Sequence, residues 1–486
     1  MATDMARHFS AGDLARCALP SIATVAVASI YGIIDGLFVS NFAGTTAFAA
    51  VNIIMPFIMI LAATGTMIGT GGSAVVGTTR GSGRSALANA QFTLFVTAAG
   101  LIGAALAIVG AVGMRPISGL LGAQPGSFQD QAVLYGTISM VSLPFFVLQY
   151  AFQELFVTAG KPKLGLGVMA ASGCMNIVLD ALLVGMLGWG VAGAAWATVA
   201  SEYVGGLLPL VYFSRRKNTS HLRLLGPREL RRQLNGNDPD TTALRLLGKA
   251  CSNGSSEMVT TLSQSVVAML YNLQLMAYAG QDGVAAYGVI MYVFMIFSAV
   301  FIGYAMAYAP LASFQRGAGR MDEVGSLVRK SLGLNACGGV TMLVFAQISA
   351  PVVAQIFVGY DPQLAAFTEH GFRLYSFAFL AMGVSIYSSS FFTALGNGKV
   401  SALISFLRTF VFEAGSVLLL PLILGVDGIW LAIDVAECAS VIISLAFVFG
   451  LRKVYGYPLR PAWHANQTTS HAQEEVAGTD GQRLPE

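Results

Sequence analysis

Eight acidic residues lie inside long apolar stretches of this chain. They are Asp35, Glu154, Asp180, Glu202, Glu257, Glu413, Asp434 and Glu437. An ionised side chain in lipid costs about 3 kcal/mol or more, so an acid kept there is by default functional. A carboxylate without a partner in apolar surroundings attracts a proton or a hard cation, because either one neutralises its charge. These residues therefore predict ion binding inside an apolar protein.

Asp35 and Asp180 have other oxygen-bearing side chains close to them. Ser172, Asn176 and Asp180 follow one another at i, i+4 spacing and therefore share one helix face. At about 1.5 Å per residue, Asp35, Asp180 and Thr198 lie roughly 6–12 Å from the same membrane surface, with Asn176 somewhat deeper. We expect these groups to meet and to bind a proton or a hard monovalent cation. The alternative is that the polar groups only join helices to one another.

The acids in the second half of the chain lie at different depths. Glu257 lies near the start of its apolar stretch, whereas Asp434 and Glu437 lie near the opposite membrane surface in the last one. Arg408 precedes Glu413 by one and a half helical turns and most simply pairs with it or with another acid.

The composition and the apolar runs indicate that these acids lie in transmembrane helices. Of 486 residues, 55% are hydrophobic and 10% are charged, against roughly 25% charged in soluble proteins. A spanning helix needs roughly 20 apolar residues, and strands would be half as long and alternating. Twelve runs qualify, at 14–39, 48–77, 90–112, 134–157, 163–188, 191–213, 250–279, 284–312, 331–357, 370–394, 400–424 and 429–451. We therefore expect an all-α integral membrane protein.

The positive charges predict the orientation of the chain. If both termini are cytosolic, 24 of the 27 lysines and arginines fall on the cytosolic side. The exceptions are Arg115 in an outside loop and Arg373 and Arg408 within predicted helices. Because basic residues are retained on the cytosolic side, we expect a multi-pass protein of the cytoplasmic (inner) membrane with both termini in the cytosol.

The chain repeats itself at an offset of 236 residues. Arg80-Gly-Ser-Gly-Arg84 returns as Arg316-Gly-Ala-Gly-Arg320, and Lys163 matches Lys399. Six spans are an even number, so both copies insert in the same orientation and are related by an axis along the membrane normal. Such an arrangement places a binding cavity at the interface of the two copies.

The repeat and the polar segments divide the chain into four parts. We expect an N-terminal lobe of six helices over residues 1–213, a basic cytosolic linker over 214–249 and a C-terminal lobe of six helices over 250–451. The polar residues 452–486 are expected to form a disordered cytosolic tail.

The sequence lacks the motifs that are typical of several functional classes. The five cysteines are scattered without a CxxC pair, and there is no His-Glu-x-x-His, Gly-x-Ser-x-Gly or P-loop motif. Basic residues do not alternate with aromatic residues as in nucleic-acid interfaces. We therefore expect no enzymatic activity, no cofactor, no metal other than a possible Na⁺, and no nucleic-acid partner.

Motifs across nearly the whole chain resemble those of multidrug and toxic compound extrusion (MATE) transporters. The resemblance is to the DinF-like prokaryotic branch, which has an aspartate on the first helix. It rests on Pro20 with Tyr31-Gly-Ile-Ile-Asp35, Asn176-Ile-Val-Leu-Asp180, Gly193-Ala-Ala-Trp-Ala-Thr198, Ala285-Ala-Tyr-Gly288 and Phe391-Phe-Thr-Ala-Leu-Gly396.

The resemblance implies an antiporter that exports small organic, mainly cationic compounds in exchange for H⁺ or Na⁺. It implies a coupling-ion site formed by Asp35, Asn176, Asp180 and Thr198, a hinge in the first helix at Pro20, and a second acidic site at Glu257. We also expect Glu437 and Asp434 to belong to this substrate or second acidic site. Glu413 and Asp434 depart from the family pattern, which has no acid there. The implied partners are amphipathic drugs, the coupling ion and membrane lipid, and we expect a monomer.

Two other transporter classes compete with this interpretation. A lipid-linked precursor flippase of the same superfamily would favour a cationic cavity, whereas the buried charges here are mostly acidic. A major-facilitator transporter is suggested by Arg80-Gly-Ser-Gly-Arg84, but the acidic residue expected just upstream is missing. Without a P-loop for ATP, we expect an ion gradient to supply the energy in each case.

Overall fold

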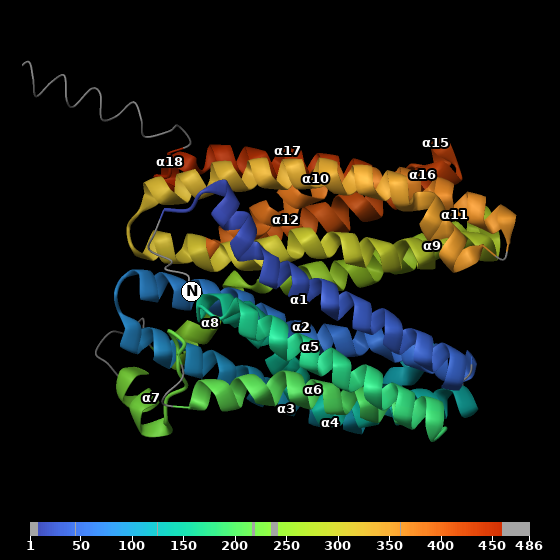
Figure 1. The fold of residues 1–486 in the computed structure, drawn as a ribbon, viewed down its shortest axis with the longest axis horizontal. Helices are drawn as coiled ribbons and strands as arrows, with labels where there is room; N and C mark the ends of the chain where they lie inside the picture. The colour runs from blue at the N-terminus through green and yellow to red at the C-terminus, as the bar shows by residue number, and fades with distance from the viewer. Residues whose placement is uncertain are drawn as a thin grey trace, which may run out of the picture.

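Two helical lobes lie side by side in the computed structural model (Figure 1). The structure describes residues 8–43, 45–123, 125–215, 219–234, 242–359 and 361–458. Within these ranges all regular secondary structure is helical, as the composition predicts. Long apolar helices of this kind satisfy their backbone hydrogen bonds internally, as lipid requires.

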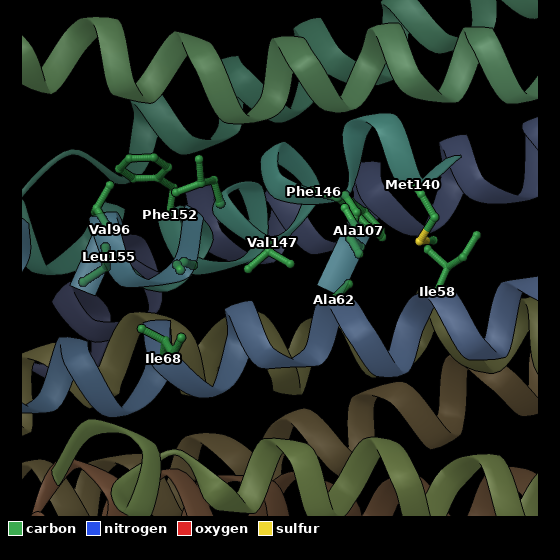
Figure 2. Packing of buried hydrophobic residues seen from close by; sticks show 14 of the residues in the cluster. Ile58, Ala62, Ile68, Val96, Ala107, Met140, Phe146, Val147, Phe152 and Leu155 are labelled. Carbon is green, nitrogen blue, oxygen red and sulfur yellow. The ribbon is translucent and has the colours of Figure 1, made fainter. Parts of the chain in front are cut away.

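Six long helices form the N-terminal lobe. They are α1 (Ala11–Phe38), α2 (Thr45–Gly81), α3 (Ser85–Leu120), α4 (Ser127–Thr158), α5 (Pro162–Leu179) and α6 (Gly190–Ser214), with π-helical segments η1 (Val39–Ala43) and η2 (Asp180–Met186). The core between α2, α3 and α4 is continuous; for example, Ile58 of α2 lies beside Met140 of α4 (Figure 2). Gly65 brings α2 against α4, because an added Cβ would lie 2.2 Å from the Val147 carbonyl oxygen.

The C-terminal lobe begins with α9 (Ser255–Gly317) and continues through shorter elements. They are α10 (Met321–Val358), α11 (Pro362–Tyr375), the 3₁₀ turn η4 (Ser376–Ala378), α12 (Phe379–Ala394), α13 (Gly398–Ser405), the π-helical η5 (Phe406–Glu413), α14 (Ala414–Leu419), α15 (Pro421–Leu424), α16 (Val426–Trp430) and α17 (Ala432–Gly450). One apolar cluster contains residues of the first half of α12, and a second contains residues of its second half together with the start of α1.

The described residues contain eleven continuous helical stretches that are long and apolar enough to cross a membrane. One of them, Ala243–Gly317, is 75 residues long and is broken at Gly280, whose φ of 65° and ψ of −149° are not helical. Glycine tolerates this conformation, which other residues rarely adopt. The break separates two spans and gives the twelve that the sequence predicts.

The linker and the start of the tail contain short helices. In the expected linker, α7 (Pro227–Leu234) and α8 (Ala243–Asn253) flank residues 235–241, which lie outside the described residues. Residues 452–458, which the sequence assigns to a disordered tail, are instead folded: α18 (Arg452–Tyr455) is followed by buried Tyr457, whose hydroxyl donates to the Val448 carbonyl at 2.5 Å. The rest of the expected tail, 459–486, lies outside the described residues.

The repeated arginines perform the same task in both lobes. Arg80 donates to the Thr158 carbonyl at the end of α4 at 2.6 Å, and Arg316 donates to the Leu395 carbonyl just after α12. Carbonyls at a helix C-terminus lack intrahelical donors and carry partial negative charge, so a cation stabilises them. The repeated Arg-Gly-x-Gly-Arg motif therefore includes a helix cap conserved between the two halves of this chain.

Backbones of the two lobes touch at one end of the bundle. We call it the basic end, and it contains residues 80–84, residues 316–320, α7 and α8 (Figure 1). A Cβ added to Gly81 would lie 2.0 Å from the Phe314 carbonyl oxygen, and one added to Gly317 would lie 2.0 Å from that of Thr78. The two contacts are equivalent under the 236-residue repeat. Only glycine permits so close an approach of α2 and α9.

We expect Gly317→Ala to separate the lobes at the basic end, because the new methyl group cannot fit against Thr78. Overpacking costs about 1–3 kcal/mol, and about 1 kcal/mol shifts a two-state population roughly fivefold. Spin labels at positions 82 and 318, on a background without other cysteines, should give longer distances in the variant. Gly333→Ala is the control, since its Cβ meets nothing within 4 Å. An unchanged distance in Gly317→Ala would mean that this contact does not hold the lobes together.

Candidate functional site

Asp35, Asn176 and Asp180 come together in the N-terminal lobe. Their side chains are 7%, 1% and 0% exposed, respectively. The Asp35 carboxyl on α1 lies close enough to interact with Asp180 and with the Asn176 amide, both from the α5–η2 helix. The geometry therefore brings together three of the four residues of the predicted ion site.

Four side-chain oxygens of this cluster lack donors. Within the described chain, neither carboxylate oxygen of Asp180 accepts a hydrogen bond, and neither does Oδ1 of Asp35 or of Asn176. Two ionised carboxylates cannot donate to each other, so they repel until a proton or cation lies between them. An unsatisfied buried carboxylate is costly, and this cluster contains two. The arrangement is therefore chemically suited to bind one small positive ion.

Thr198 approaches the cluster through a tyrosine. Its hydroxyl donates to the Ala194 carbonyl at 3.0 Å within α6, and it also interacts with the hydroxyl of Tyr135 from α4. Tyr135 is buried and lies within electrostatic reach of both Asp35 and Asp180. The sequence does not identify Tyr135 as a site residue, because nothing in the spacing of α4 distinguishes it from the other aromatic residues of the spans.

Glu202 is a neighbour of the cluster with a partner of its own. The Ser142 hydroxyl donates to its carboxylate at 2.5 Å, joining α4 to α6. In the same region the Ser172 hydroxyl donates to the Ser201 carbonyl at 2.7 Å, joining α5 to α6. Ser172 and Ser142 therefore connect helices, whereas Asp35 and Asp180 keep free oxygens.

Charged residues of both lobes lie in π-helical segments. Asp180 opens the π-helical η2, and Arg408 and Glu413 lie in the π-helical η5. A π-bulge inserts an extra residue into the helical ladder, turns side chains out of α-helical register, and is frequent at functional sites. The i, i+4 spacing that places Asn176 and Asp180 on one face therefore does not extend beyond Asp180.

The predicted hinge residue Pro20 lies inside α1 next to a tight contact with the C-terminal lobe. Its carbonyl accepts from the Thr24 hydroxyl at 2.7 Å. Two residues on, Ile22 packs closely on Gly303 of α9. A Cβ added to Gly303 would lie 2.4 Å from the Ile22 Cα. Further along α1, the Tyr31 ring packs against Gly173 of α5. The helix that carries Asp35 thus contacts both lobes (Figure 1).

The C-terminal lobe contains a buried ion pair. Arg408 pairs with Glu437 rather than with its sequence neighbour Glu413, at 2.7 Å from Nε and 2.5 Å from Nη2 to Oε1. The two side chains are 15% and 3% exposed. Because Glu437 is neutralised by protein, it is less available as a cargo ligand than the sequence suggests.

The other predicted C-terminal acids lie on either side of this pair. Asp434 faces the backbone of Ala378 in η4, and neither of its oxygens accepts a well-formed hydrogen bond. Glu257 interacts electrostatically with Arg408 and with Glu154 of the N-terminal lobe. The structure therefore places Glu257 at the boundary of the two lobes and Asp434 within the C-terminal lobe, where it is half-buried. Within the described residues, no group of three His, Cys, Asp or Glu side chains could hold a metal ion.

Comparisons with known proteins identify similar chains. The model of the MatE family matches residues 20–182 and 258–416. The multidrug export protein MepA of Staphylococcus haemolyticus is 22% identical over 436 residues, covering 89% of this chain and 92% of that protein. The probable multidrug resistance protein YoeA of Bacillus subtilis is 23% identical over 467 residues, covering 93% and 94%.

Solved structures share the fold. A crystal structure of MATE in complex with MaL6 superposes with a TM-score of 0.84 at 20% identity, over 92% of this chain and 97% of that one. A MOP superfamily transporter from Pyrococcus furiosus, described as having a binding pocket of reverse polarity that suggests a different function, gives 0.82 at 19% identity over 93% and 98%.

We expect Arg408→Leu to lower the free energy of unfolding by about 3–5 kcal/mol, because it leaves the Glu437 carboxylate buried without its partner. Replacing both Arg408 and Glu437 by leucine removes both charges and should restore most of the loss. Thermal unfolding of the purified variants in one uncharged detergent measures this double-mutant cycle. Additive losses in the double variant would show that the two charges do not stabilise each other.

Proposed function

Because this chain belongs to the MatE family, we propose that it is a secondary active multidrug exporter, which exchanges small organic, mainly cationic compounds for H⁺ or Na⁺. The observation that carries the proposal is the buried Asp35–Asp180 pair, in which three of the four carboxylate oxygens accept no hydrogen bond within the described chain. Relatives described as multidrug export or resistance proteins over about nine-tenths of the chain support the choice of cargo.

The coupling ion binds between Asp35 and Asp180, with oxygens of Asn176 and Thr198 within the same region. Binding cancels the repulsion of the two carboxylates and allows α1 to pack closely on α5. Loss of the ion restores the repulsion and favours separation of Asp35 from Asp180. Since α1 also packs on Gly303 of the other lobe, its movement changes the interface between the lobes. Pro20 is the natural hinge, because it lacks the N–H of an unbroken helix.

Transport follows alternating access, with the cargo site between the lobes. We place the protein in the cytoplasmic membrane with both termini in the cytosol. In this orientation the basic end faces the cytosol. The close glycine contacts at that end then correspond to a state closed to the cytosol. An ion entering from outside reaches Asp35 and Asp180, which lie in the half of the lobe remote from the basic end.

The polarity of the buried charges favours cationic cargo over a lipid-linked pyrophosphate. Glu257 and Glu413 lie within electrostatic reach of Arg408, which is already paired with Glu437. In the described chain, the interacting neighbours of Asp35, Asp180 and Asp434 include other carboxylates but no basic residue. A pyrophosphate would need free cations in the cavity. Flipping of a lipid-linked precursor is therefore the weaker proposal for this chain.

We expect Asp35→Asn and Asp180→Asn to abolish coupled export while leaving the protein folded, because asparagine keeps the shape of aspartate but cannot take up a charge-neutralising ion. The measurement is efflux of a fluorescent organic cation from proteoliposomes, with proton and sodium gradients imposed separately. Asp282→Asn, which removes an exposed acid, is the matched control and should export normally. Full export by either test variant would refute the assignment of the ion site.

A different outcome is expected for Glu257→Gln. Glu257 lies at the lobe boundary, so we expect its charge to attract cationic cargo without holding the coupling ion. Removing one nearby charge should weaken apparent affinity for a cationic dye by ~tenfold, which corresponds to about 1.4 kcal/mol, and should barely affect a neutral substrate. Concentration dependence of transport for one cationic and one neutral substrate distinguishes the cases. Equal losses for both would place Glu257 in the ion pathway or in the structural core.

A further inference from the structure

A cavity of about 670 Å³ lies at the basic end, where three parts of the chain meet. Its walls come from the end of α2 and the start of α3, from α8, and from the residues that close α9 and precede α13. It is remote from Asp35 and Asp180, and the proposed transport mechanism does not use it.

Four cationic side chains line this cavity, and no acidic residue does. Arg84 comes from the N-terminal lobe, Lys249 from α8, and Arg316 and Lys399 from the C-terminal lobe. In the described part of the chain none of the four forms an ion pair, and neither lysine makes a side-chain hydrogen bond. Arg316 uses one N–H on the Leu395 carbonyl, which leaves its other donors available. Four positive charges without counterions favour a multiply charged anion.

The side-chain amides of two buried residues place a second requirement on a ligand of this cavity. Gln91 is 3% exposed and Asn253 is 5% exposed, and both line the cavity. The carbonyl oxygen of each amide accepts no hydrogen bond within the described chain. For Asn253 the orientation is fixed, because its Nδ2 donates to the Thr393 carbonyl at 2.8 Å. A ligand that satisfies both groups of residues needs anionic oxygens for the cations and hydroxyl donors for the amides.

We propose that this cavity binds a phosphate ester that carries free hydroxyl groups, as in glycerol phosphate or the headgroup of phosphatidylglycerol. A phosphate offers several oxygens to arginine and lysine at once, which a single carboxylate does not. The hydroxyls of the glycerol match the acceptors on Gln91 and Asn253. A headgroup reaching the cavity from the membrane surface and a soluble ester have the same chemistry.

Binding would join the two lobes, because Arg84 belongs to one lobe and Arg316 and Lys399 to the other. A bound phosphate therefore adds contacts across the interface that Gly81 and Gly317 bring together. A ligand that binds the folded state in this way raises the unfolding temperature.

The first experiment measures thermal unfolding of the full chain in an uncharged detergent. One arm adds dioleoyl phosphatidylglycerol, a second adds soluble glycerol 1-phosphate, and the reference adds phosphatidylcholine or potassium chloride at equal ionic strength. Stabilisation by the first arm alone identifies the lipid headgroup as ligand, and stabilisation by the second identifies the soluble ester as sufficient. If neither arm exceeds its reference, the proposal is wrong.

The second experiment places the effect in the cavity. In Lys249→Gln/Lys399→Gln, the ligand concentration for half-maximal stabilisation should rise roughly tenfold or more, since each basic residue near a phosphate contributes about a fivefold gain. Lys163→Gln/Arg232→Gln removes the same charge at the same end outside the cavity. Lys163 is the repeat counterpart of Lys399, so the control is closely matched. Equal ligand responses of both double variants and wild type, with unchanged unfolding temperatures without ligand, would overturn the proposal.

Discussion

A buried charge in lipid must find a partner, and this constraint accounts for the placement of polar groups in the protein. Arg408 and Glu437 satisfy this constraint by neutralising each other, as a buried pair between η5 and α17. Glu202 satisfies this constraint in part, because its carboxylate accepts a hydrogen bond from the Ser142 hydroxyl. Asp35 and Asp180 have no basic partner in the described chain: they lie near each other, and three of their four carboxylate oxygens accept no hydrogen bond. The missing partner of this pair is the ion that we propose drives transport.

The second constraint is that lipid gives helices no hydrophobic reason to associate. Close backbone packing at small residues takes the place of that driving force. Gly65 brings α2 against α4 within one lobe, Gly81 and Gly317 bring α2 and α9 together between lobes, and Gly303 brings α1 against α9. The contacts between the lobes run along α2 and α9 and along α1 and α9, and Leu14 and Ala18 of α1 belong to an apolar cluster of the C-terminal lobe. In the proposed alternating access, the two lobes separate along the α2–α9 part of this interface.

The sequence predicts the helices well because each span is a long apolar run, and the repeat predicts two lobes. It also predicts that Asp35, Asn176 and Asp180 meet, because depth and i, i+4 spacing depend only on regular helix geometry. It fails where tertiary contacts decide. Arg408 pairs with Glu437, 29 residues away, because η5 shifts the helical register, and no local pattern shows this. Tyr135 and Gly303 act through neighbours on other helices, and the short helix α18 with buried Tyr457 follows a polar composition that favours disorder.

In our proposal, cargo binding between the lobes is coupled to release of the ion held between Asp35 and Asp180. This coupling is tested most directly by adding a cationic dye to purified protein in weakly buffered detergent and measuring released protons with a pH indicator and released sodium with ²²Na. We expect dye binding to the wild type to release H⁺ or Na⁺, and we expect Asp35→Asn to bind the dye but to release neither. Release of the same amount of ion by wild type and Asp35→Asn would contradict the proposal.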